Sequence, residues 1–513
     1  MLTLLLVLPL AVPAVLALSP PSLSPRRVSS FAAFSLFAYS AWLLLQFDPS
    51  TAALQFSEYH RWIDPIGLSY SLGVDGLSLP LIVLTTLLTW VAILCSPLEQ
   101  NRSKFYYSLI FLATAGMIGA LAAQNLLLFF LFYELEIIPF FFLISIWGSG
   151  NHQYAAFKFL LYTAVSGVLI LVAFFGLAWA GEGGSFDFAS LDLSSLGLRT
   201  KLILLTLVLV GFGIKVPIIP VHTWQPDVYV AASPAVAMLL GGVLAKLGTY
   251  GLVRFGLQLF PETWTLVGPG IAVIGSVSVI YGSMSAIAQK DIKRMVAYSS
   301  IGHMGYIIVA AAAGTTLSTL GAVAQMIAHG LILALLFHLV GLVEAKAGTR
   351  DLDKLNGLMN PVRGLPLTSA LLVLAGMASA GIPGLVGFAA ELLVFQGSFP
   401  IFPIPTIICI LSSGLTAVYF VILINRTCFG RLDNRLAYYP KVTPSEQIPA
   451  LILTVLIFVL GLQPNLLLRW TEATTTAMVA GLGLPPQETI ALTAASPPLA
   501  PTAPPPISTP PDA

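Results

Sequence analysis

Residues 211–255 read GFGIKVPIIPVHTWQPDVYVAASPAVAMLLGGVLAKLGTYGLVRF, and this stretch decides the fold. It places two lysines, Lys215 and Lys246, inside otherwise apolar sequence. A cation at the centre of a helix in hydrocarbon costs about 2.5 to 3.5 kcal/mol, and such residues usually mark a path for ions or protons. Lys215 precedes Pro217 by two residues, so its ammonium could still reach the headgroups by snorkelling. Lys246 lies near the middle of the apolar run 234–257 and lacks that exit, so we expect it to be buried and functional.

The composition extends this interpretation to the whole chain. Of 513 residues, 57% are hydrophobic and 9% are charged, whereas charged residues make up about 25% of soluble domains. The chain is therefore a polytopic membrane protein. A net charge of +1 without a basic cluster argues against nucleic acid as a partner. Cys95, Cys409 and Cys428 lack the spacing of metal or redox sites.

Apolar runs long enough to cross about 30 Å of hydrocarbon predict an all-α membrane protein with about 14 transmembrane helices. The first run has no basic segment before it and no clear cleavage site, so it is expected to be a retained helix rather than a signal peptide. The Pro-, Ala- and Thr-rich tail 484–513 is not expected to pack. The polar insert 47–70 is expected to cap the non-cytoplasmic face. The predicted ranges are 2–18, 29–46, 77–96, 106–123, 125–147, 156–180, 202–219, 233–257, 264–288, 295–313, 317–343, 366–397, 402–425 and 447–468.

The basic residues test this helix count. Placed on alternate sides of fourteen helices, they divide about three to one, as the positive-inside rule expects. Arg26, Lys293 and Arg426 are examples on the cytoplasmic side, and Arg61 and Arg254 on the other. An error of one helix in mid-chain would remove this asymmetry of basic residues. The asymmetry therefore supports the count of fourteen helices.

Two helices are interrupted at matching places, which is typical of transporters built from inverted repeats. The breaks are KVPIIP at 215–220 and GIPG at 381–384. Each lies in the fourth helix of a five-helix block, helices 4–8 and helices 9–13. The predicted division is 1–104 for helices 1–3 and the non-cytoplasmic loop, 105–258 and 259–430 for the two antiporter-like repeats, 431–483 for helix 14 and 484–513 for the tail.

Two acidic residues, Glu134 and Glu136, lie at the heart of the fifth helix. Two positions on a helix correspond to about 200° around its axis, so both cannot face one partner. The packing context of Phe132 and Tyr133 favours Glu134 as the partner of Lys215. A purely structural ion pair, which would only fix packing, stays open as the alternative.

Histidines and a further acid follow. His303 and His329 have polar neighbours, whereas His338 is interpreted as a hydrogen-bonded packing residue. Imidazole titrates near neutral pH and can pass a proton on, and Glu391 lies in an apolar setting. Together with the lysines these residues form a candidate chain for proton hopping. Carboxylates and histidines do not share one helix face at metal-ligand spacing, and there is no dinucleotide-binding, haem or iron–sulfur motif.

With these residues identified, the sequence resembles the M-type (chain 4) antiporter-like membrane subunits of complex I, in the branch found in photosynthetic NAD(P)H dehydrogenase-like complexes. The resemblance covers about residues 70–470 and is carried by YELEIIP, KFLLYTAVSG, KVPIIPVHTWQPD, LAKLGTYGLVRF, AYSSIGHMG and GIPGLVGFAAEL. It implies roles for six residues: Glu134 as the fifth-helix glutamate, Lys215 and Lys246 as the two lysines, His303 and His329 as the connecting histidines, and Glu391 as the terminal acid. Related L- and N-type subunits usually carry lysine at the last position.

The resemblance implies a proton-translocating subunit without a cofactor of its own, in a thylakoid membrane. NAD(P)H or ferredoxin, iron–sulfur clusters and plastoquinone are then expected in partner subunits, and the partners are other membrane-arm subunits, hydrophilic subunits and lipids. One segment departs from the family, which usually has LPDAHGEA where this chain has QPDVYVAA at 225–232. The departure puts the usual proton entry in doubt and points to a divergent paralogue, such as the form in CO2-uptake complexes.

Two other functions stay open from the sequence. A monovalent cation/proton antiporter subunit of the Mrp type would show sodium-linked activity without a redox partner. A scaffold whose buried charges only hold its neighbours in register would keep its function without Lys246.

Overall fold

A computed structural model describes residues 1–97, 101–180, 185–432 and 439–482 of the chain, so the predicted tail 484–513 lies outside the described residues. In chain order the elements are α1 (Leu2–Leu18), α2 (Pro25–Gln46), β1 (Gln55–Ile63), η1 (Asp64–Ile66), β2 (Leu68–Val74), α3 (Ser78–Cys95), α4 (Ser103–Ala122), α5 (Leu126–Leu135), α6 (Ile137–Trp147), α7 (His152–Ala180), η2 (Phe188–Ser190), α8 (Leu198–Lys215), α9 (Trp224–Ala231), α10 (Pro234–Leu239), η3 (Leu240–Leu244), α11 (Ala245–Gly251), η4 (Leu252–Leu257), α12 (Pro261–Ile287), α13 (Ile292–Ala313), α14 (Thr316–Ala347), α15 (Pro366–Ser379), α16 (Val386–Ser398), α17 (Pro403–Cys428), α18 (Pro444–Leu462), α19 (Asn465–Leu468) and α20 (Glu472–Ala480).

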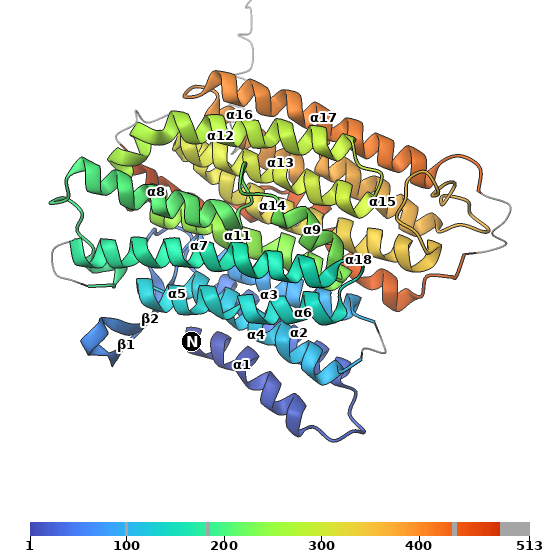
Figure 1. Cartoon of the computed structure of the whole chain (residues 1–513), viewed down its shortest axis with the longest axis horizontal. Coiled ribbons are helices and arrows are strands. Elements are labelled where there is room, and N and C mark those ends of the chain that lie inside the picture. The colour runs from blue at the N-terminus through green and yellow to red at the C-terminus, as the bar shows by residue number, and fades with distance from the viewer. Residues whose placement is uncertain (98–100, 181–184, 433–438, 483–513) are drawn as a thin grey trace, which may run out of the picture.

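The helices lie side by side with their axes along one direction, from α1 at one edge of the bundle to α17 at the other (Figure 1). Two helical stretches lie at the centre of the bundle. The most apolar 18 residues of α14 and of the run Pro234–Leu257 are entirely buried within the chain. The candidate site residues on these two helices are therefore shielded from lipid.

Eleven helices of the described residues are long and apolar enough to cross a membrane. Three shorter apolar helices, α1, α15 and α16, add to them, and α8 carries three basic residues in its 18. Each of the fourteen predicted ranges contains helix. The protein is a multi-pass integral membrane protein, while the count of fourteen crossings stays a prediction.

The expectation that the fold is entirely helical is wrong for the insert 47–70, which forms a β-hairpin. Strands β1 and β2 pair antiparallel, with Tyr59 opposite Ser71. The turn between them ends at Gly67, whose φ of 69° is a left-handed conformation that glycine adopts without a Cβ clash. Figure 1 shows the hairpin at one end of the bundle, beside the N-terminus. The hairpin lies at one corner of that end, and its place on the non-cytoplasmic face stays a prediction.

The two predicted helix breaks are present. The first separates α8 from α9 directly after Lys215. The second separates α15 from α16, the helix that carries Glu391. Two irregularities were not predicted. Glu136 is a junction residue between α5 and α6, and the helical run around Lys246 contains two π-helical turns, η3 and η4. Such π turns frequently occur at functional sites.

Close packing of α12 on α13 supplies a stability prediction. A Cβ atom at Gly282 would lie 2.5 Å from the backbone nitrogen of Gly302, whereas one at Gly270 on the same helix would meet nothing within 4 Å. We expect Gly282→Ala to destabilise the purified protein by about 1 to 3 kcal/mol through overpacking. Gly270→Ala, the matched control, should leave the melting temperature unchanged or raise it, because alanine favours helix. Equal melting temperatures for the two variants would contradict this packing.

Candidate functional site

The first centre of the site pairs Lys215 with Glu136, not with Glu134. The Lys215 ammonium forms an ion pair with Glu136 Oε1, and both side chains are fully buried. Snorkelling of Lys215 to the headgroups is thereby excluded. The expected partner, Glu134, was the wrong choice of the two acids.

Helix geometry explains why Glu136, and not Glu134, faces Lys215. The ring of Tyr133 lies 3.3 Å from the Lys215 Nζ atom, measured to the ring centroid. Residues three apart share a helix face, so Glu136 falls on the same side as Tyr133, whereas Glu134 is turned about 100° away. The prediction that only one acid can face Lys215 is confirmed. That acid is Glu136, because it shares a helix face with Tyr133, whose ring packs against the Lys215 ammonium.

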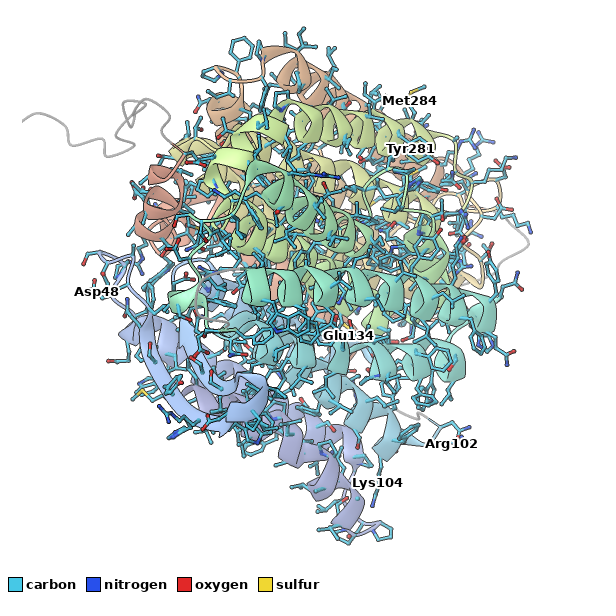
Figure 2. The ribbon with its side chains drawn as sticks, turned by 60° about the vertical axis from the view of Figure 1, so that its left-hand side comes forward. Asp48, Arg102, Lys104, Glu134, Tyr281 and Met284 are labelled. Carbon is cyan, nitrogen blue, oxygen red and sulfur yellow. The ribbon has the colours of Figure 1, made fainter. Side chains whose placement is uncertain are left out.

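Glu134 points instead at α7. A Cβ atom at Gly167 would lie 2.1 Å from Glu134 Oε1, so the carboxylate occupies the space left by that glycine. Its Oε1 atom is buried and makes no hydrogen bond to the described residues. Figure 2 shows Glu134 midway along the bundle, far from the ends marked by Asp48 and by Arg102. The residue is a second carboxylate at the depth of Lys215.

Residues at the end of α8 and just beyond it form hydrogen bonds with three neighbouring helices. The last carbonyl groups of a helix lack intrahelical partners; Trp224 Nε1 donates to Ile214 O at 2.8 Å. Beyond the break, the Ile219 N–H donates to Ser278 Oγ at 3.2 Å. Ser166 Oγ on α7 donates to Gly211 O at 2.7 Å and contacts the Tyr133 hydroxyl at 3.0 Å. The broken helix thus delivers Lys215 to a defined position.

Lys246 lies at the centre of the second group. Its ammonium donates to the carbonyl of Gly241, five residues earlier in the π-helical turn η3. It also contacts His329 Nδ1 on α14 at 2.9 Å. The side chain is buried, as predicted, and within the described part of the chain it forms no ion pair with a carboxylate. A lysine without a counter-charge is far easier to deprotonate than one in an ion pair.

From Lys246 a row of ionisable side chains continues to Glu391. The rings of His329 and His303 stack with centroids 5.2 Å apart. His303 Nδ1 lies 3.7 Å from Glu391 Oε1, and its Nε2 contacts Ser379 Oγ at 3.0 Å. Glu391 Oε2 accepts from Ser413 Oγ at 3.0 Å. The structure therefore brings together four of the predicted site residues in one buried line.

The second helix break makes room for this acid. Gly381, with φ of 69°, lies so close to Glu391 that a Cβ atom there would be 2.5 Å from Oε2. Any other residue would push the carboxylate away and would strain the backbone. The break therefore leaves the space that the Glu391 carboxylate occupies.

The two groups do not touch each other. Lys215 is on α8 and Lys246 on α11, and these helices pack closely, with Gly248 facing Val216. His338 lies outside the row, because its Nε2 contacts Glu446 O at 2.9 Å. The predicted hydrogen bond of His338 is present, and its role as a packing residue stays a prediction.

Three further buried charges escaped the sequence analysis. Arg254 on η4 forms an ion pair with Asp75, which precedes α3. Lys293 on α13 is buried and donates to the carbonyls of Val230 and Ala232. Arg254 had a usable signal, since it follows Lys246 by eight residues on one apolar helix. Its partner Asp75 is 179 positions away in sequence, and no local pattern reveals such a pair.

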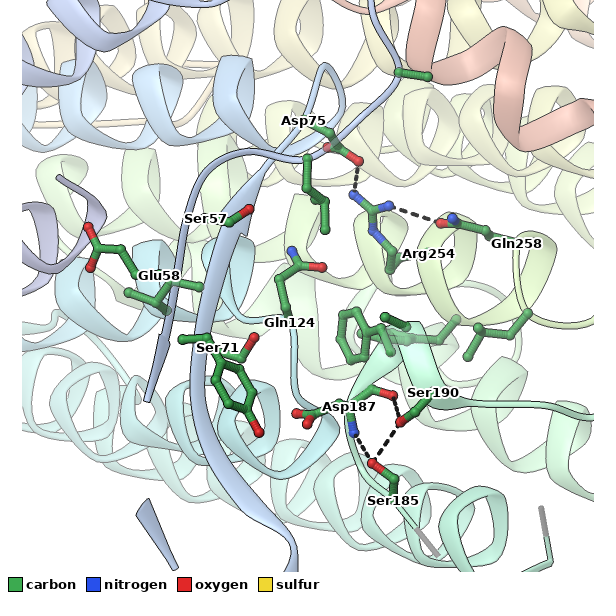
Figure 3. A pocket seen from close by; sticks show the side chains of 18 residues that line it. Ser57, Glu58, Ser71, Asp75, Gln124, Ser185, Asp187, Ser190, Arg254 and Gln258 are labelled. Atoms are coloured by element: carbon green, nitrogen blue, oxygen red, sulfur yellow. Dashed lines mark hydrogen bonds and ion pairs between the residues drawn. The ribbon is translucent and has the colours of Figure 1, made fainter. Parts of the chain in front are cut away.

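Two cavities lie at opposite ends of the helical run Pro234–Leu257. The first, about 580 Å³, is lined by Ser233, Pro234, Lys293, Glu344 and Glu446, and the positive-inside rule places it on the cytoplasmic side. The second, about 650 Å³, lies under the hairpin (Figure 3). Lys246 lies between the two ends. Among the described residues there is no cluster of three His, Cys, Asp or Glu that could hold a metal ion.

The Asp75 carboxyl provides a pH prediction. Burial raises its pKa, but the Arg254 guanidinium and the N–H groups of Leu77 and Ser78 outweigh burial and hold the pKa below the ordinary 3.8. A carboxyl with a lowered folded-state pKa stabilises the fold above that ordinary value and loses this contribution as the pH falls through the folded-state pKa.

We therefore expect Asp75→Asn to lower the melting temperature at pH 7, with a loss of about 3 to 5 kcal/mol because Arg254 is left unpaired. The gap between Asp75→Asn and the unchanged protein should narrow below pH 3.8. Thermal unfolding in detergent from pH 7 to pH 3 measures both effects. A gap that is constant over this range would contradict the assignment.

Comparison with known proteins adds to this geometry. Residues 123–416 match the family described as NADH:quinone oxidoreductase/Mrp antiporter, TM. The chain is 39% identical over 454 residues to a protein of Synechococcus elongatus named NAD(P)H-quinone oxidoreductase chain 4 1, covering 87% of this chain and 84% of the relative. It is 36% identical over 492 residues to NAD(P)H-quinone oxidoreductase chain 4 3 of Trichormus variabilis, covering 92% and 90%.

Solved structures agree with these relatives. A chain of respiratory complex I from Thermus thermophilus matches with a TM-score of 0.86 and 25% identity, covering 94% of this chain and 100% of that one. A chain of the Mrp complex from Dietzia sp. shares the fold, with a TM-score of 0.81 and 23% identity over 94% of this chain and 99% of that one. The protein belongs to the NADH:quinone oxidoreductase/Mrp antiporter family of membrane subunits, and its similarity is to the chain 4 subunits of NAD(P)H-quinone oxidoreductases.

Proposed function

We propose that this chain is a proton-translocating membrane-arm subunit of an NAD(P)H-quinone oxidoreductase complex, in which quinone reduction in partner subunits drives proton pumping. The observation that carries the proposal is the buried row from Lys246 through His329 and His303 to Glu391. Each member can gain and lose a proton. Lys246 contacts His329, the rings of His329 and His303 stack, and His303 Nδ1 lies 3.7 Å from Glu391 Oε1. Keeping such groups away from water is costly and needs a function to justify it.

Glu136, Lys215 and Lys246 would form the coupling end of the path. While Glu136 holds Lys215 in an ion pair, the Lys215 charge is largely neutralised. If Glu136 is protonated or moves, Lys215 becomes an uncompensated cation on the helix packed against the one that carries Lys246, and it would disfavour a proton there. Coupling of this kind is reciprocal, so protonation of Lys246 must also affect the Lys215–Glu136 pair.

Protons would enter from the cytoplasmic cavity of about 580 Å³. This cavity reaches Ser233 and Pro234, the start of the helical run that carries Lys246. It lies beside the segment 225–232, where the sequence departs from the family. Entry through this cavity would replace a route that depends on the residues missing from that segment.

The finer architecture is part of the proposal. Fourteen crossings with two inverted five-helix repeats, 105–258 and 259–430, are supported by the two breaks in equivalent helices, one at Lys215 and one before Glu391. The segments 1–104, 431–483 and 484–513 would be additions outside the repeats.

The partners follow from the absence of redox motifs in this sequence. NAD(P)H or ferredoxin, iron–sulfur clusters and plastoquinone would belong to partner subunits, and other antiporter-like subunits and lipids would flank this chain. A thylakoid location is supported by the cyanobacterial origin of the relatives. The cation/proton antiporter function is the second candidate, supported by the shared fold of the Mrp chain.

One experiment separates the two candidates. The complex that contains this chain is purified and its subunits are identified. It is then reconstituted in vesicles, and acidification is recorded with NAD(P)H or reduced ferredoxin and a quinone. We expect hydrophilic redox subunits in the preparation and acidification that depends on electron donor but not on sodium. Acidification that needs a sodium gradient and no electron donor would establish the antiporter instead.

A further inference from the structure

Three polar residues follow Lys246 at four-residue spacing: Tyr250, Arg254 and Gln258. Residues four apart lie on one helix face, and the π-helical turn η4 continues this alignment. Tyr250 is fully buried, Arg254 is 6% exposed and Gln258 is exposed. The face therefore leads from the buried lysine to the end of the bundle that carries the hairpin.

This face ends in the cavity under the hairpin. The cavity, about 650 Å³, is lined by Asp75, Gln124, Asp187, Arg254 and Gln258. Figure 3 shows Arg254 between Asp75 and Gln258 at the wall of this space. The carboxylates outnumber the cation here, so the space suits water and released protons. The positive-inside rule places it on the non-cytoplasmic side.

The contacts along the face connect Tyr250 to the cavity. Arg254 Nε donates to the Tyr250 hydroxyl at 3.3 Å, Arg254 Nη1 donates to Gln258 Oε1 at 2.9 Å, and Nη2 donates to Asp75. The guanidinium thus occupies the side of the Tyr250 oxygen that faces the cavity. Because guanidinium does not deprotonate in proteins, it blocks proton passage rather than carrying it.

The contacts on the other side connect Tyr250 to Lys246. The Tyr250 hydroxyl donates to Leu121 O at 3.4 Å. Leu121 also lines a small pocket beside Lys246, together with Thr85 and Val243. This pocket is too small for a water molecule in the present arrangement. Leu121 therefore links the two residues, because it lines the pocket beside Lys246 and its carbonyl accepts from the Tyr250 hydroxyl.

We propose that Tyr250 is a proton relay from Lys246 to the cavity under the hairpin, and that Arg254, held by Asp75, is its gate. The inference rests on the proposed function and adds to it a second release branch, which bypasses His303 and Glu391. When the contact between Arg254 Nε and the Tyr250 hydroxyl opens while Arg254 stays bound to Asp75 and Gln258, the Tyr250 oxygen becomes accessible from the cavity.

The step conserves atoms and charge. Lys246 releases a proton and becomes a neutral amine, and the Tyr250 oxygen accepts a proton, directly or through one water, as its own hydrogen leaves to water in the cavity. The tyrosine is unchanged afterwards, and Lys246 is reloaded from the cytoplasmic side. Arg254 keeps its charge throughout and repels a proton that returns from the cavity, which makes the branch directional.

A purely structural role is the competing explanation, since the Asp75–Arg254 pair also ties the hairpin to the bundle. The two roles differ in one respect. A structural clamp that is removed lets the protein loosen, and any leak that follows should not depend on one tyrosine hydroxyl. A gate that is removed should open a leak that needs this hydroxyl.

The test uses the complete complex in vesicles that contain a pH-sensitive dye. A pH step is imposed without electron donor, and the passive proton leak is measured for Arg254→Gln and for Arg254→Gln combined with Tyr250→Phe. We expect Arg254→Gln to raise the leak at least about tenfold, which corresponds to a barrier lowered by about 1.4 kcal/mol. The double variant should leak like the unchanged complex. Arg61→Gln, an exposed arginine on the hairpin, controls for loss of one positive charge at this face.

Each outcome decides between the explanations. If Arg254→Gln does not raise the passive proton leak, or if the leak persists in the double variant, Arg254 is not a gate. Tyr250→Phe alone, which keeps the ring, should lower the protons pumped per electron while quinone reduction continues, and an unchanged ratio overturns the relay. Lys246→Met is measured in parallel: if it pumps normally, the proposed function fails, whereas if it stops pumping while Arg254→Gln does not leak, only the branch fails.

Discussion

Lys246→Met is expected to abolish proton pumping by the complex while the complex still assembles. Methionine has nearly the shape of lysine but cannot carry a proton, so it would interrupt the row at the contact with His329. Loss of a group that transfers protons typically costs a factor of about 10² to 10⁴ in rate. We expect proton transport to fall at least about a hundredfold, measured as dye-detected acidification per quinone reduced.

The stability of Lys246→Met, unlike its pumping activity, should not fall. Lys246 pairs with no carboxylate among the residues that the structure describes. An apolar side chain of similar volume at a buried charged position is often neutral or stabilising. The melting temperature of Lys246→Met should therefore equal or exceed that of the unchanged protein. Lys201→Met is the matched control, because Lys201 lies outside the row and pairs with the exposed Glu262. Normal pumping by Lys246→Met would leave the scaffold function as the explanation.

Glu136→Gln and Glu134→Gln form the second test, and their effects should be very unequal. Glu136→Gln removes the charge that faces Lys215. Breaking a buried pair from one side costs about 3 to 5 kcal/mol, since the remaining charge is left unpaired. We expect lower stability together with loss of pumping, because Lys215 would adjust by losing its proton.

Glu134→Gln changes an acid of the same type two positions away, beside Gly167 rather than Lys215. It should retain the melting temperature and a larger part of the pumping activity. Both variants are compared by thermal unfolding and by acidification in the same vesicles. If Glu134→Gln proves the more damaging of the two, the ion pair seen in this structure is not the one that couples transport.

The sequence by itself determined the class of protein and most of the site. Composition alone requires a membrane protein, and a lysine in mid-helix has to be buried in the bundle, because the alternative is a cation in lipid. These conclusions depend on the cost of exposing a group to hydrocarbon, which is a property of the residue and its immediate neighbours. Lys246, His303, His329 and Glu391 could therefore be predicted as buried candidates, and the structure places them in one row.

Only the tertiary structure decided which charges meet. Helix periodicity shows that Glu134 and Glu136 point to different sides, but the orientation of the helix depends on Tyr133 packing over Lys215 from another helix. The same holds for Asp75 and Arg254, which belong to segments far apart in the sequence, and for the strand pairing of 55–74. Contacts between distant segments depend on how whole helices rotate and pack, and local sequence does not encode that rotation.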